Sequence, residues 1–398
     1  MIPASVQALL PTLVRWRRHL HENPELGYEE HQTQAFIMEQ LKEMGLKPYA
    51  AGDTGVAVDI GSSGPRVLAR ADIDALPIDE EADVPYRSKN AGAMHACGHD
   101  GHTAIMLGVA SILPELLDQR GGRARLIFQP AEERHPGGAL KMIRDGLLDD
   151  VVRVTGLHLQ AEMESGRIGA RVGVQSANSD RFRIDIEGRG GHGSAPHETA
   201  DPVPVLGQMI SGLQTLVSRM VDPVDAAVVT IGAVKAGSAF NAIPSSAEIR
   251  GTVRTFRKEV QDHIEAAMTR MVEGIAAASG VQGTLTYMRG YPSVVNTAQE
   301  VRLLQEVIEE HAGPNVWMAV PERMGGEDFS YYLHERPGVF WNLGAQPEAH
   351  PYPHHHGRFT FDEAVMPLGV WIMAQTVLAF AEEPMSVDTL GGMFDGSS

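Results

Sequence analysis

The sequence predicts an α/β protein in which a central, mostly parallel sheet is flanked by helices and a ferredoxin-like α+β domain is inserted. Apolar strand and helix patterns alternate in the first 160 residues and resume after residue 290, as in a parallel sheet with crossover helices. The segment between them follows the order β-α-β-β-α-β, the split motif of ferredoxin-like folds. We therefore expect a discontinuous domain over residues 1–178 and 290–385, an inserted domain over residues 179–289 and a flexible tail over residues 386–398.

Helices and apolar strands follow one another in the first part of the chain. Apolar residues at helical spacing predict a helix over residues 5–22, which Asn23 and Pro24 end because the residue before proline avoids the helical conformation. A second helix is expected over residues 33–44, before Gly45. Strands are expected at residues 56–60, 67–71, 125–128 and 154–159, and helices at residues 102–117 and 139–148.

Alternation of polar and apolar residues over residues 181–187 predicts a half-buried strand at the start of the inserted domain. Its other strands are expected at residues 227–234, 248–256 and 283–289, and its helices at residues 202–219 and 259–278. A helix at residues 301–310, a strand at residues 339–343 and a helix at residues 362–382 are expected to return the chain to the first domain. No apolar stretch approaches the 18 residues that span a bilayer, so we expect no membrane partner.

The chain is strongly acidic: 33 basic and 51 acidic residues give a formal charge of −18 with histidine neutral. Such a field repels phosphate backbones and anionic membranes, so no nucleic-acid partner is expected. The single cysteine, Cys97, cannot form an internal disulfide. The N-terminal basic residues follow the apolar ones, which is the reverse of a secretory signal, and we expect a cytoplasmic location.

Side chains of the kinds that bind metals gather in residues 94–102, which read MHACGHDGH. One thiol and three imidazoles suit zinc and related cations. The alternative is structural, namely a buried free cysteine with two histidines capping the helix that follows. The donors of this segment are His95, Cys97, His99 and His102.

Further donors follow two buried strands, where open α/β sheets place their ligands. Glu132 and Glu133 point to opposite sides of an extended chain, so that one can bind metal while the other faces the substrate as a base. His158 ends another strand, although a core histidine is an alternative there. The donors exceed the needs of one tetrahedral site, so we predict a pair of metals with Glu132 as the base. The remaining histidines of this set are His350, His354, His355 and His356.

Two other kinds of site are less well supported. Residues 188–193 match the G-x-G-x-x-G dinucleotide pattern, but Pro196 and Pro202 interrupt the helix that such a site requires. Cys97 could instead act as a nucleophile with a histidine as base. That alternative leaves Glu132, Glu133 and the histidine run without a role.

The motifs along the chain resemble those of M20 metallopeptidase-family amidohydrolases, in the branch of hippurate hydrolases, N-acyl-amino-acid amidohydrolases (aminoacylases) and auxin-conjugate hydrolases. The resemblance runs from about residue 17 to about residue 380. It implies that the inserted domain is a lid through which the chain forms a homodimer or a higher homo-oligomer. The matching motifs are RHLHENPEL (18–26), RADIDALP (70–77), MHACGHDGH (94–102), FQPAEE (128–133), GGHGSAPH (190–197), NAIP (241–244), GTVRTF (251–256) and GEDF (326–329).

The resemblance also implies roles for individual residues. Glu132 resembles the family's general base, and Asp74 occupies the place of a carboxylate that orients a metal ligand. His192, on the lid, resembles the residue that reaches the partner subunit's site and stabilises the oxyanion. The implied metal ligands are Cys97, in the place of a bridging aspartate, His99, Glu133, His158 and His355, and the implied substrate-binding residues are Asn241, Arg254, Gly326 and Glu327.

The last metal ligand departs from the family pattern, because Gly357 stands where a proline usually follows. The register that aligns Arg358 and Phe359 selects His355, and His354 or His356 stays open as a substitute.

The predicted reaction is hydrolysis of the amide bond of an N-acyl amino acid, of the hippurate or N-acetyl type, by water that the metals activate. Within the family, a dipeptidase or an N-acetyl-diaminopimelate deacetylase is the nearest alternative. A non-catalytic metal-binding subunit is an alternative of another class. Thiolate ligation favours zinc, and manganese, cobalt or nickel could occupy the same positions.

Overall fold

The computed structural model describes residues 1–348 and 352–383. The chain divides into two compact units. Unit 1 comprises Met1–Gln175, Val294–Pro321 and the chain from Asp328 onward, and unit 2 comprises Ser176–Ser293 and Glu322–Glu327. The predicted tail at residues 386–398 and the candidate donor His350 lie outside the described residues.

Unit 1 is built on an eight-stranded sheet with the order β1-β2-β4-β3-β5-β16-β6-β15. The pairs β4/β3, β3/β5, β5/β16 and β6/β15 are parallel, whereas β1/β2, β2/β4 and β16/β6 are antiparallel. The predicted mostly parallel α/β fold class is therefore confirmed. The strands are β1 (Tyr49–Ala51), β2 (Gly55–Ser63), β3 (Arg66–Asp72), β4 (Gly122–Gln129), β5 (Val151–Gln160), β6 (Ile168–Ala170), β15 (Trp317–Ala319) and β16 (Gly338–Gly344), with a separate pair β7 (Gly173–Ser176) and β14 (Val294–Asn296).

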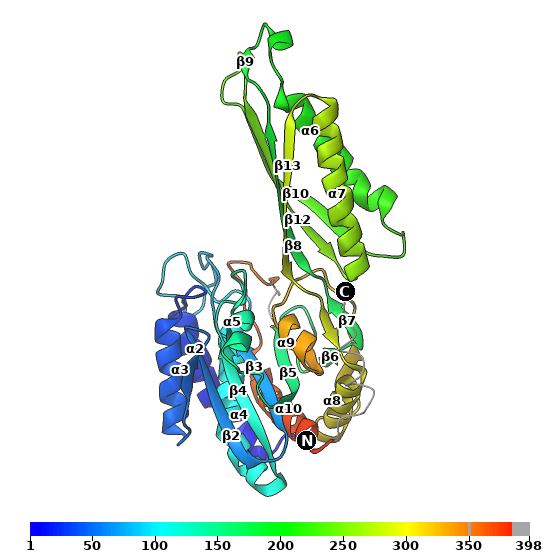
Figure 1. Ribbon diagram of the computed structural model, residues 1–398. Helices are drawn as coiled ribbons and strands as arrows, with labels where there is room; N and C mark the ends of the chain where they lie inside the picture. The colour runs from blue at the N-terminus through cyan, green and yellow to red at the C-terminus, as the bar shows by residue number, and fades with distance from the viewer. Residues whose placement is uncertain (349–351, 384–398) are drawn as a thin grey trace. The chain divides into compact units, whose positions relative to one another are not determined.

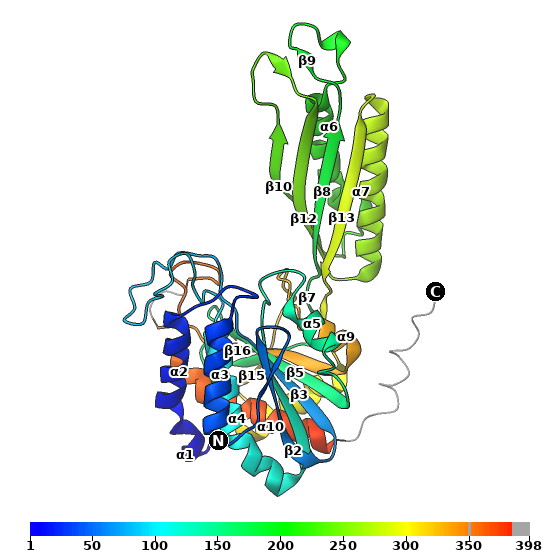
Figure 2. The ribbon, with the colours of Figure 1, turned by 60° about the vertical axis from the view of Figure 1, so that its left-hand side comes forward.

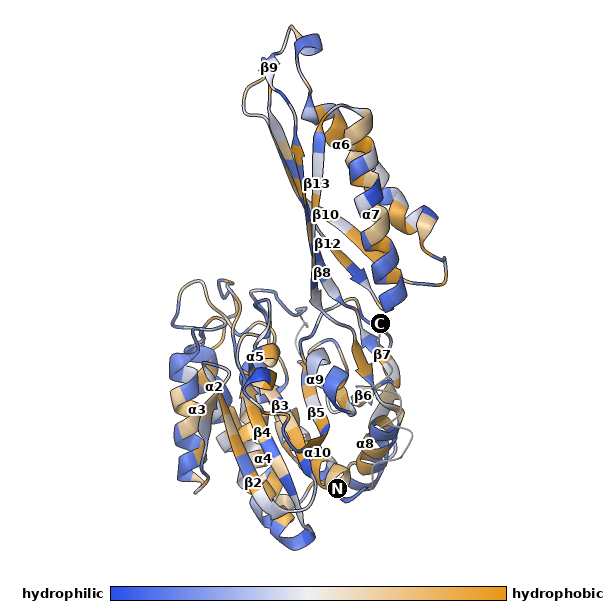
Figure 3. Cartoon of the chain, viewed as in Figure 1, coloured by the Kyte–Doolittle hydropathy of each residue, from blue (hydrophilic) through white to orange (hydrophobic). Residues whose placement is uncertain are grey.

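Helices cover both faces of this sheet (Figure 1). Alternate residues of one strand face different cores: Val67 and Ala69 belong to the core that includes residues of α2, α4 and α10, whereas Leu68 belongs to the core that includes residues of α5 and α9. Colouring by hydropathy shows apolar residues concentrated on the strands and on α10 (Figure 3). The helices of unit 1 are α1 (Ala4–Gln7), α2 (Leu10–Glu22), α3 (His31–Glu43), α4 (His99–Arg120), α5 (Gly138–Arg144), α8 (Ala298–His311), α9 (Ser330–Glu335) and α10 (Met366–Glu382), with a short 3-10 turn at Glu363–Val365.

The N-terminal helix expected over residues 5–22 is two helices, α1 and α2. Pro11 lies in the first turn of α2 and has no N–H, so it cannot donate to the carbonyl of Gln7 and continue α1. Asn23 ends α2, as predicted.

One helix is long and apolar enough to span a membrane by length and composition alone. The expectation that no apolar stretch approaches 18 residues is therefore wrong. The segment Glu363–Glu382 is long and apolar enough, but 78% of its apolar window is buried inside the protein. Helix α10 packs on α4, α8 and the central strands. At Gly108 of α4, a side chain would collide with Val370 of α10 at 2.5 Å, which shows how closely the two helices approach. A helix that is apolar on all sides is either buried in a protein core or spans a membrane. Helix α10 is the central core helix of unit 1.

Unit 2 is a four-stranded antiparallel sheet with the order β10-β12-β8-β13. Helices α6 and α7 pack on one face of it (Figure 2), where Phe182, Ile184 and Met268 form the core. The opposite face carries the polar side chains of the alternating strands. The elements are β8 (Ser179–Glu187), α6 (Pro202–Thr215), a π-helical turn (Leu216–Met220), β10 (Ala227–Ala236), β12 (Ser246–Thr255), α7 (Lys258–Ala278) and β13 (Gln282–Tyr291), with a small pair β9 (Gly191–His192) and β11 (Ala242–Ile243) and a 3-10 turn at Pro196–Glu198.

Candidate metal centre

The predicted metal donors of unit 1 come from the ends of neighbouring elements. Cys97 precedes α4, and Gly98, at φ 96°, makes the turn that lets the helix begin at His99. Glu132 and Glu133 follow β4, and His158 lies near the end of β5. Because β4, β3 and β5 are parallel neighbours, their carboxyl ends lie at one edge of the sheet, and the donors meet there.

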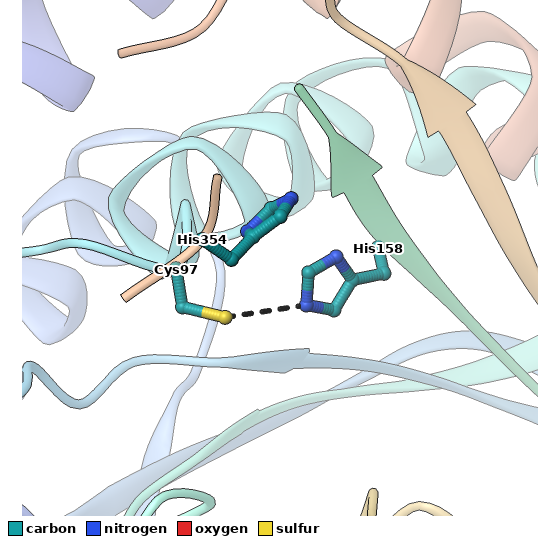
Figure 4. Close-up of side chains that lie close together, drawn as sticks. All are labelled: Cys97, His158 and His354. Atoms are coloured by element: carbon teal, nitrogen blue, oxygen red, sulfur yellow. Dashed lines mark hydrogen bonds between the residues drawn. The ribbon is translucent and has the colours of Figure 1, made fainter. Parts of the chain in front are cut away.

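Cys97 lies at the centre of the donors. Its Sγ is 3.4 Å from Nε2 of His158, and the His354 ring lies beside both (Figure 4). Donor atoms of Cys97, His158 and His354 lie within 4.8 Å of one another, and so do those of Cys97, Glu133 and His355. One thiol therefore belongs to two donor groups, each of which could hold a cation.

His99 has the orientation of a metal-binding imidazole. Its Nδ1 lies 3.0 Å from the backbone oxygen of Asp74 and 3.3 Å from the Asp74 carboxylate. Its buried Nε2 has no hydrogen-bond partner among the described residues and lies 3.6 Å from Oδ2 of Asp72. His99 also shares a 4.8 Å group with Glu132 and Glu133. A histidine that donates through one nitrogen to a carbonyl or carboxylate presents the other nitrogen to a metal.

His158 is held in the same way. Its Nδ1 donates to the backbone oxygen of Leu159 at 2.7 Å, so that Nε2, the nitrogen that faces Cys97, is the unprotonated one in the neutral ring. Burial lowers the pKa of His158 well below its usual value, and the neighbouring His102 and His354 add to this. The ring is therefore neutral at physiological pH, as a metal ligand must be.

The backbone around the glutamate pair is fixed by two buried carboxylates. Asp74 accepts the backbone N–H of Glu132 through Oδ1 and that of Glu133 through Oδ2, both at 3.0 Å. Glu30 accepts the N–H of Ala131 at 2.8 Å, and Ala131 has the left-handed φ of 53°. These contacts turn the chain so that the two glutamate side chains enter the site.

The histidine run separates into three environments. His355, at φ 65°, donates its backbone N–H to Ala96, and its Nε2 lies 3.0 Å from Oε1 of Glu133. His354 faces Cys97 and His158. His356 stacks on Tyr352 at a ring distance of 4.7 Å and belongs to none of the donor groups found in residues 1–348 and 352–383. The structure thus brings two of the three histidines to the site.

Sequence reasoning missed the polar network beneath the donors. Asp72 accepts from Nδ1 of His102 at 2.5 Å and from Nη1 of Arg70 at 2.6 Å. Nε2 of His102 accepts the backbone N–H of Leu159 at 2.8 Å, so both of its nitrogens are engaged and this histidine of the motif acts as a support. The signal was the RADID segment, whose Arg70 and Asp72 are buried polar residues inside a strand.

The buried carboxylates of the site favour the binding of cations. Burial raises the pKa of the Cys97 thiol well above its usual value, and the carboxylates of Glu133, Glu132 and Asp72 raise it further. Burial lowers the pKa of His99, but the carboxylates of Asp72 and Asp74 outweigh that effect and raise it to about 10. Divalent cations stabilise such a group of buried carboxylates, and they favour the deprotonated forms of the thiol and of the imidazoles that bind them.

The other predicted site residues lie in unit 2. His192, in β9, is exposed, and its Nδ1 accepts from the backbone N–H of Ser194 at 3.2 Å, which places the proton of the neutral ring on Nε2. Asn241 lies next to it, since the backbone oxygen of Asn241 accepts the N–H of Gly193 at 2.9 Å. Arg254 is in β12, and Gly326 and Glu327 are in the short segment of unit 2 before Asp328.

Comparisons with known proteins identify the family of the chain and several relatives. The model of a family described as peptidase family M20/M25/M40 matches residues 68–379. The chain is 42% identical over 368 residues to the N-acetyl-L-cysteine deacetylase of Bacillus subtilis (strain 168), covering 92% of this chain and 87% of the relative. It is 44% identical over 287 residues to the N-acyl-L-amino acid amidohydrolase of Geobacillus stearothermophilus, covering 71% of this chain and 78% of that relative. Among solved structures, the Bacillus subtilis YXEP protein, described as a dinuclear metal binding peptidase from the M20 family, superposes with a TM-score of 0.83 at 36% identity, covering 95% of this chain and 99% of that one.

Proposed function

Since the chain belongs to peptidase family M20/M25/M40, we propose that it hydrolyses the amide bond of N-acyl amino acids with two divalent cations per subunit. The observation that carries this proposal is the place of Cys97 in two donor groups, with Glu132 beside them. The proposed ligands are Cys97 as the shared one, with His99, Glu133, His158 and His355. When bound, divalent cations polarise an amide carbonyl and lower the pKa of water. Thiolate favours zinc, and manganese, cobalt or nickel suit the same donors.

Glu132 is the proposed general base. Its backbone is fixed by Asp74, and its side chain shares a 4.8 Å group with His99 and Glu133, so it lies beside the donors. It is 7% exposed, which keeps a carboxylate close to the reacting atoms and away from bulk water. In the proposed reaction Glu132 takes a proton from the attacking water and delivers it to the amine of the released amino acid.

The residues of unit 2 are proposed to bind the substrate. His192 presents Nε2–H as a donor for the developing oxyanion, and we propose that it acts in the site of a partner subunit in a homodimer. Asn241 and Arg254 are proposed to hold the substrate carboxylate, Arg254 from one subunit and Asn241, which lies beside His192, from its partner. Gly326 and Glu327 are proposed to lie in a loop of the same pocket. Unit 2 is thus the proposed lid and dimerisation domain (residues 179–289 of the sequence prediction), and unit 1 the catalytic domain (residues 1–178 and 290–385).

A cytoplasmic location is part of the proposal. Cys97 must remain a reduced thiol to bind a cation, and reducing compartments keep thiols in that form.

The test of the proposed function is a panel of substrates assayed with the purified enzyme and several added metals. Hippurate and N-acetyl amino acids should be hydrolysed, while dipeptides and N-acetyl-diaminopimelate test the nearest alternatives. A cysteine hydrolase would keep its activity after exhaustive chelation, and a non-catalytic subunit would hydrolyse none of the panel. Hydrolysis of dipeptides alone would contradict the proposed substrate class.

A further inference from the structure

The face of the unit 2 sheet that α6 and α7 leave uncovered carries a row of arginines. Arg181 and Arg183 alternate along β8 with the buried Phe182, and Arg250 lies directly opposite Arg183 on β12. A hollow of about 610 Å³ opens on this face, and its lining includes these three arginines together with Asp185, Thr286 and Met288. Three arginines on one face of the sheet contrast with the net charge of −18 of the chain.

Two of these arginines are neutralised by neighbouring acids. Arg183 lies 2.6 Å from Asp185 and 3.0 Å from Glu248. Arg250 lies 2.8 Å from Glu248. Arg181 is exposed and has no ion pair or hydrogen bond within the part of the chain that the structure describes. Its positive charge is therefore available to a ligand, whereas the charges of Arg183 and Arg250 are already compensated.

Arg181 is a neighbour of Arg254. Thr252 lies directly opposite Arg181, and Arg254 follows two residues later on the same face, a diagonal neighbour at roughly 7–8 Å. Burial lowers the pKa of Arg254, and the positive charge of Arg181 lowers it further, against the opposing effect of Asp180. In the described chain the hydrogen bonds of Arg254 go to the backbone oxygens of Asp180 and Val253. The carboxylate of Asp180 is engaged by Gln261, Tyr287 and Gly290.

We propose that Arg181 binds a second carboxylate of the substrate, beside the carboxylate that Arg254 holds. This inference rests on the proposed function and specifies its substrate class: N-acyl amino acids that carry two carboxylates. The second carboxylate comes from either an acidic amino acid or a dicarboxylic acyl group. Two guanidinium groups on adjacent strands repel each other, and an anion with two carboxylates relieves that repulsion through charge-assisted hydrogen bonds. Met288 lies opposite Arg181 on β13 and is 46% exposed. It offers an apolar contact to the carbon chain that joins the two carboxylates of the substrate.

The test compares kcat/KM for matched substrates that differ in one charge. N-acetyl-L-glutamate against N-acetyl-L-glutamine examines the amino-acid side, and N-succinyl-L-leucine against N-butanoyl-L-leucine examines the acyl side. Arg181→Gln should lower the ratio of kcat/KM for the charged substrate to kcat/KM for the neutral one about tenfold in one of the two pairs. The loss should come mainly from a higher KM for the charged substrate. Arg183→Gln, which removes an arginine that is already paired with acids, is the matched control and should leave both ratios unchanged.

The outcomes separate this inference from the proposed function. A response in either pair supports the role of Arg181 and identifies the source of the second carboxylate. Unchanged ratios in both pairs, with the neutral substrates still hydrolysed by the wild-type enzyme, overturn the role of Arg181 alone. A wild-type enzyme that hydrolyses neither the charged nor the neutral substrates overturns the proposed function. Thermal unfolding of both variants checks that each is folded.

Discussion

The carboxylate of Asp74 accepts the backbone N–H of Glu132 at 3.0 Å, and its second oxygen accepts the N–H of the next residue at the same distance. Asp74 is fully buried and also lies 3.3 Å from Nδ1 of His99. One side chain therefore positions the proposed base, the neighbouring ligand Glu133 and the imidazole of a second ligand. A change in Asp74 should disturb metal binding and catalysis together.

Asp74→Asn should lower the affinity for divalent cations by roughly 10–100-fold, because an amide offers only one acceptor oxygen to the two backbone N–H groups. Bound metal after dialysis at graded free-metal concentrations measures the effect. Asp83→Asn, at an exposed position, is the control and should bind metal like the wild type. Equal affinities for all three proteins would contradict the positioning role of Asp74.

Glu132→Gln should retain its metal and lose turnover by at least about 10²-fold, because an amide cannot accept the proton of the attacking water. Glu133→Gln, one residue away, should lose bound metal as well, since Glu133 contacts His355 in one of the Cys97 donor groups. Metal analysis and kcat on the same preparations separate the two effects. If Glu132→Gln turned over substrate at near wild-type rate, Glu132 would not be the base.

Alanine substitution along the histidine run should distinguish the three positions. His355→Ala should lower the number of bound cations per chain, because its Nε2 lies against Glu133. His356→Ala should leave that number unchanged, since His356 stacks on Tyr352. Mass spectrometry of the native protein counts the cations. Loss of metal in His354→Ala with full retention in His355→Ala would transfer the ligand role to His354.

Glu30 predicts a pH-dependent contribution to stability. Burial raises its pKa from 4.5 to about 7, and Asp74 adds to this against the hydrogen bonds from Thr54 and Ala131. Between these two values the folded chain holds a proton that the unfolded chain releases, so stability from this group falls as the pH rises through the window, by about 3 kcal/mol in total. Glu30→Gln mimics the protonated form. The free energy of unfolding of Glu30→Gln minus that of the wild type should therefore increase from pH 4.5 to pH 7 in urea titrations.

A constant difference across that pH range would show that Glu30 does not titrate on unfolding. Both proteins must be compared at the same metal concentration, since bound cations stabilise the folded chain.

Much of the fold and of the donor cluster could be predicted because local pattern and strand direction determine them. Parallel strands bring their carboxyl ends together, so Glu133 and His158 meet Cys97 although 25 or more residues separate them along the chain. The break between α1 and α2 was not predicted, although Pro11 in the first turn of α2 signals it. The roles of Asp72 and His102 were not, because a buried ionic network depends on side-chain packing that has no sequence period.

The choice between His354 and His355 illustrates the same limit of local pattern. Adjacent residues reach different partners here because His355 adopts a left-handed φ of 65°, which sequence periodicity does not encode. The sequence analysis overlooked the long apolar stretch of α10, and only its packing inside unit 1 distinguishes this helix from a membrane span of the same composition.

The most direct test of the account is a titration of the chelated, metal-free enzyme with zinc or manganese while hydrolysis of an N-acetyl amino acid is followed. Activity should be absent at the start and should rise until about two cations are bound per chain, and Cys97→Ser should weaken both binding steps because both donor groups contain this residue. Full hydrolytic activity in the metal-free protein would contradict the account.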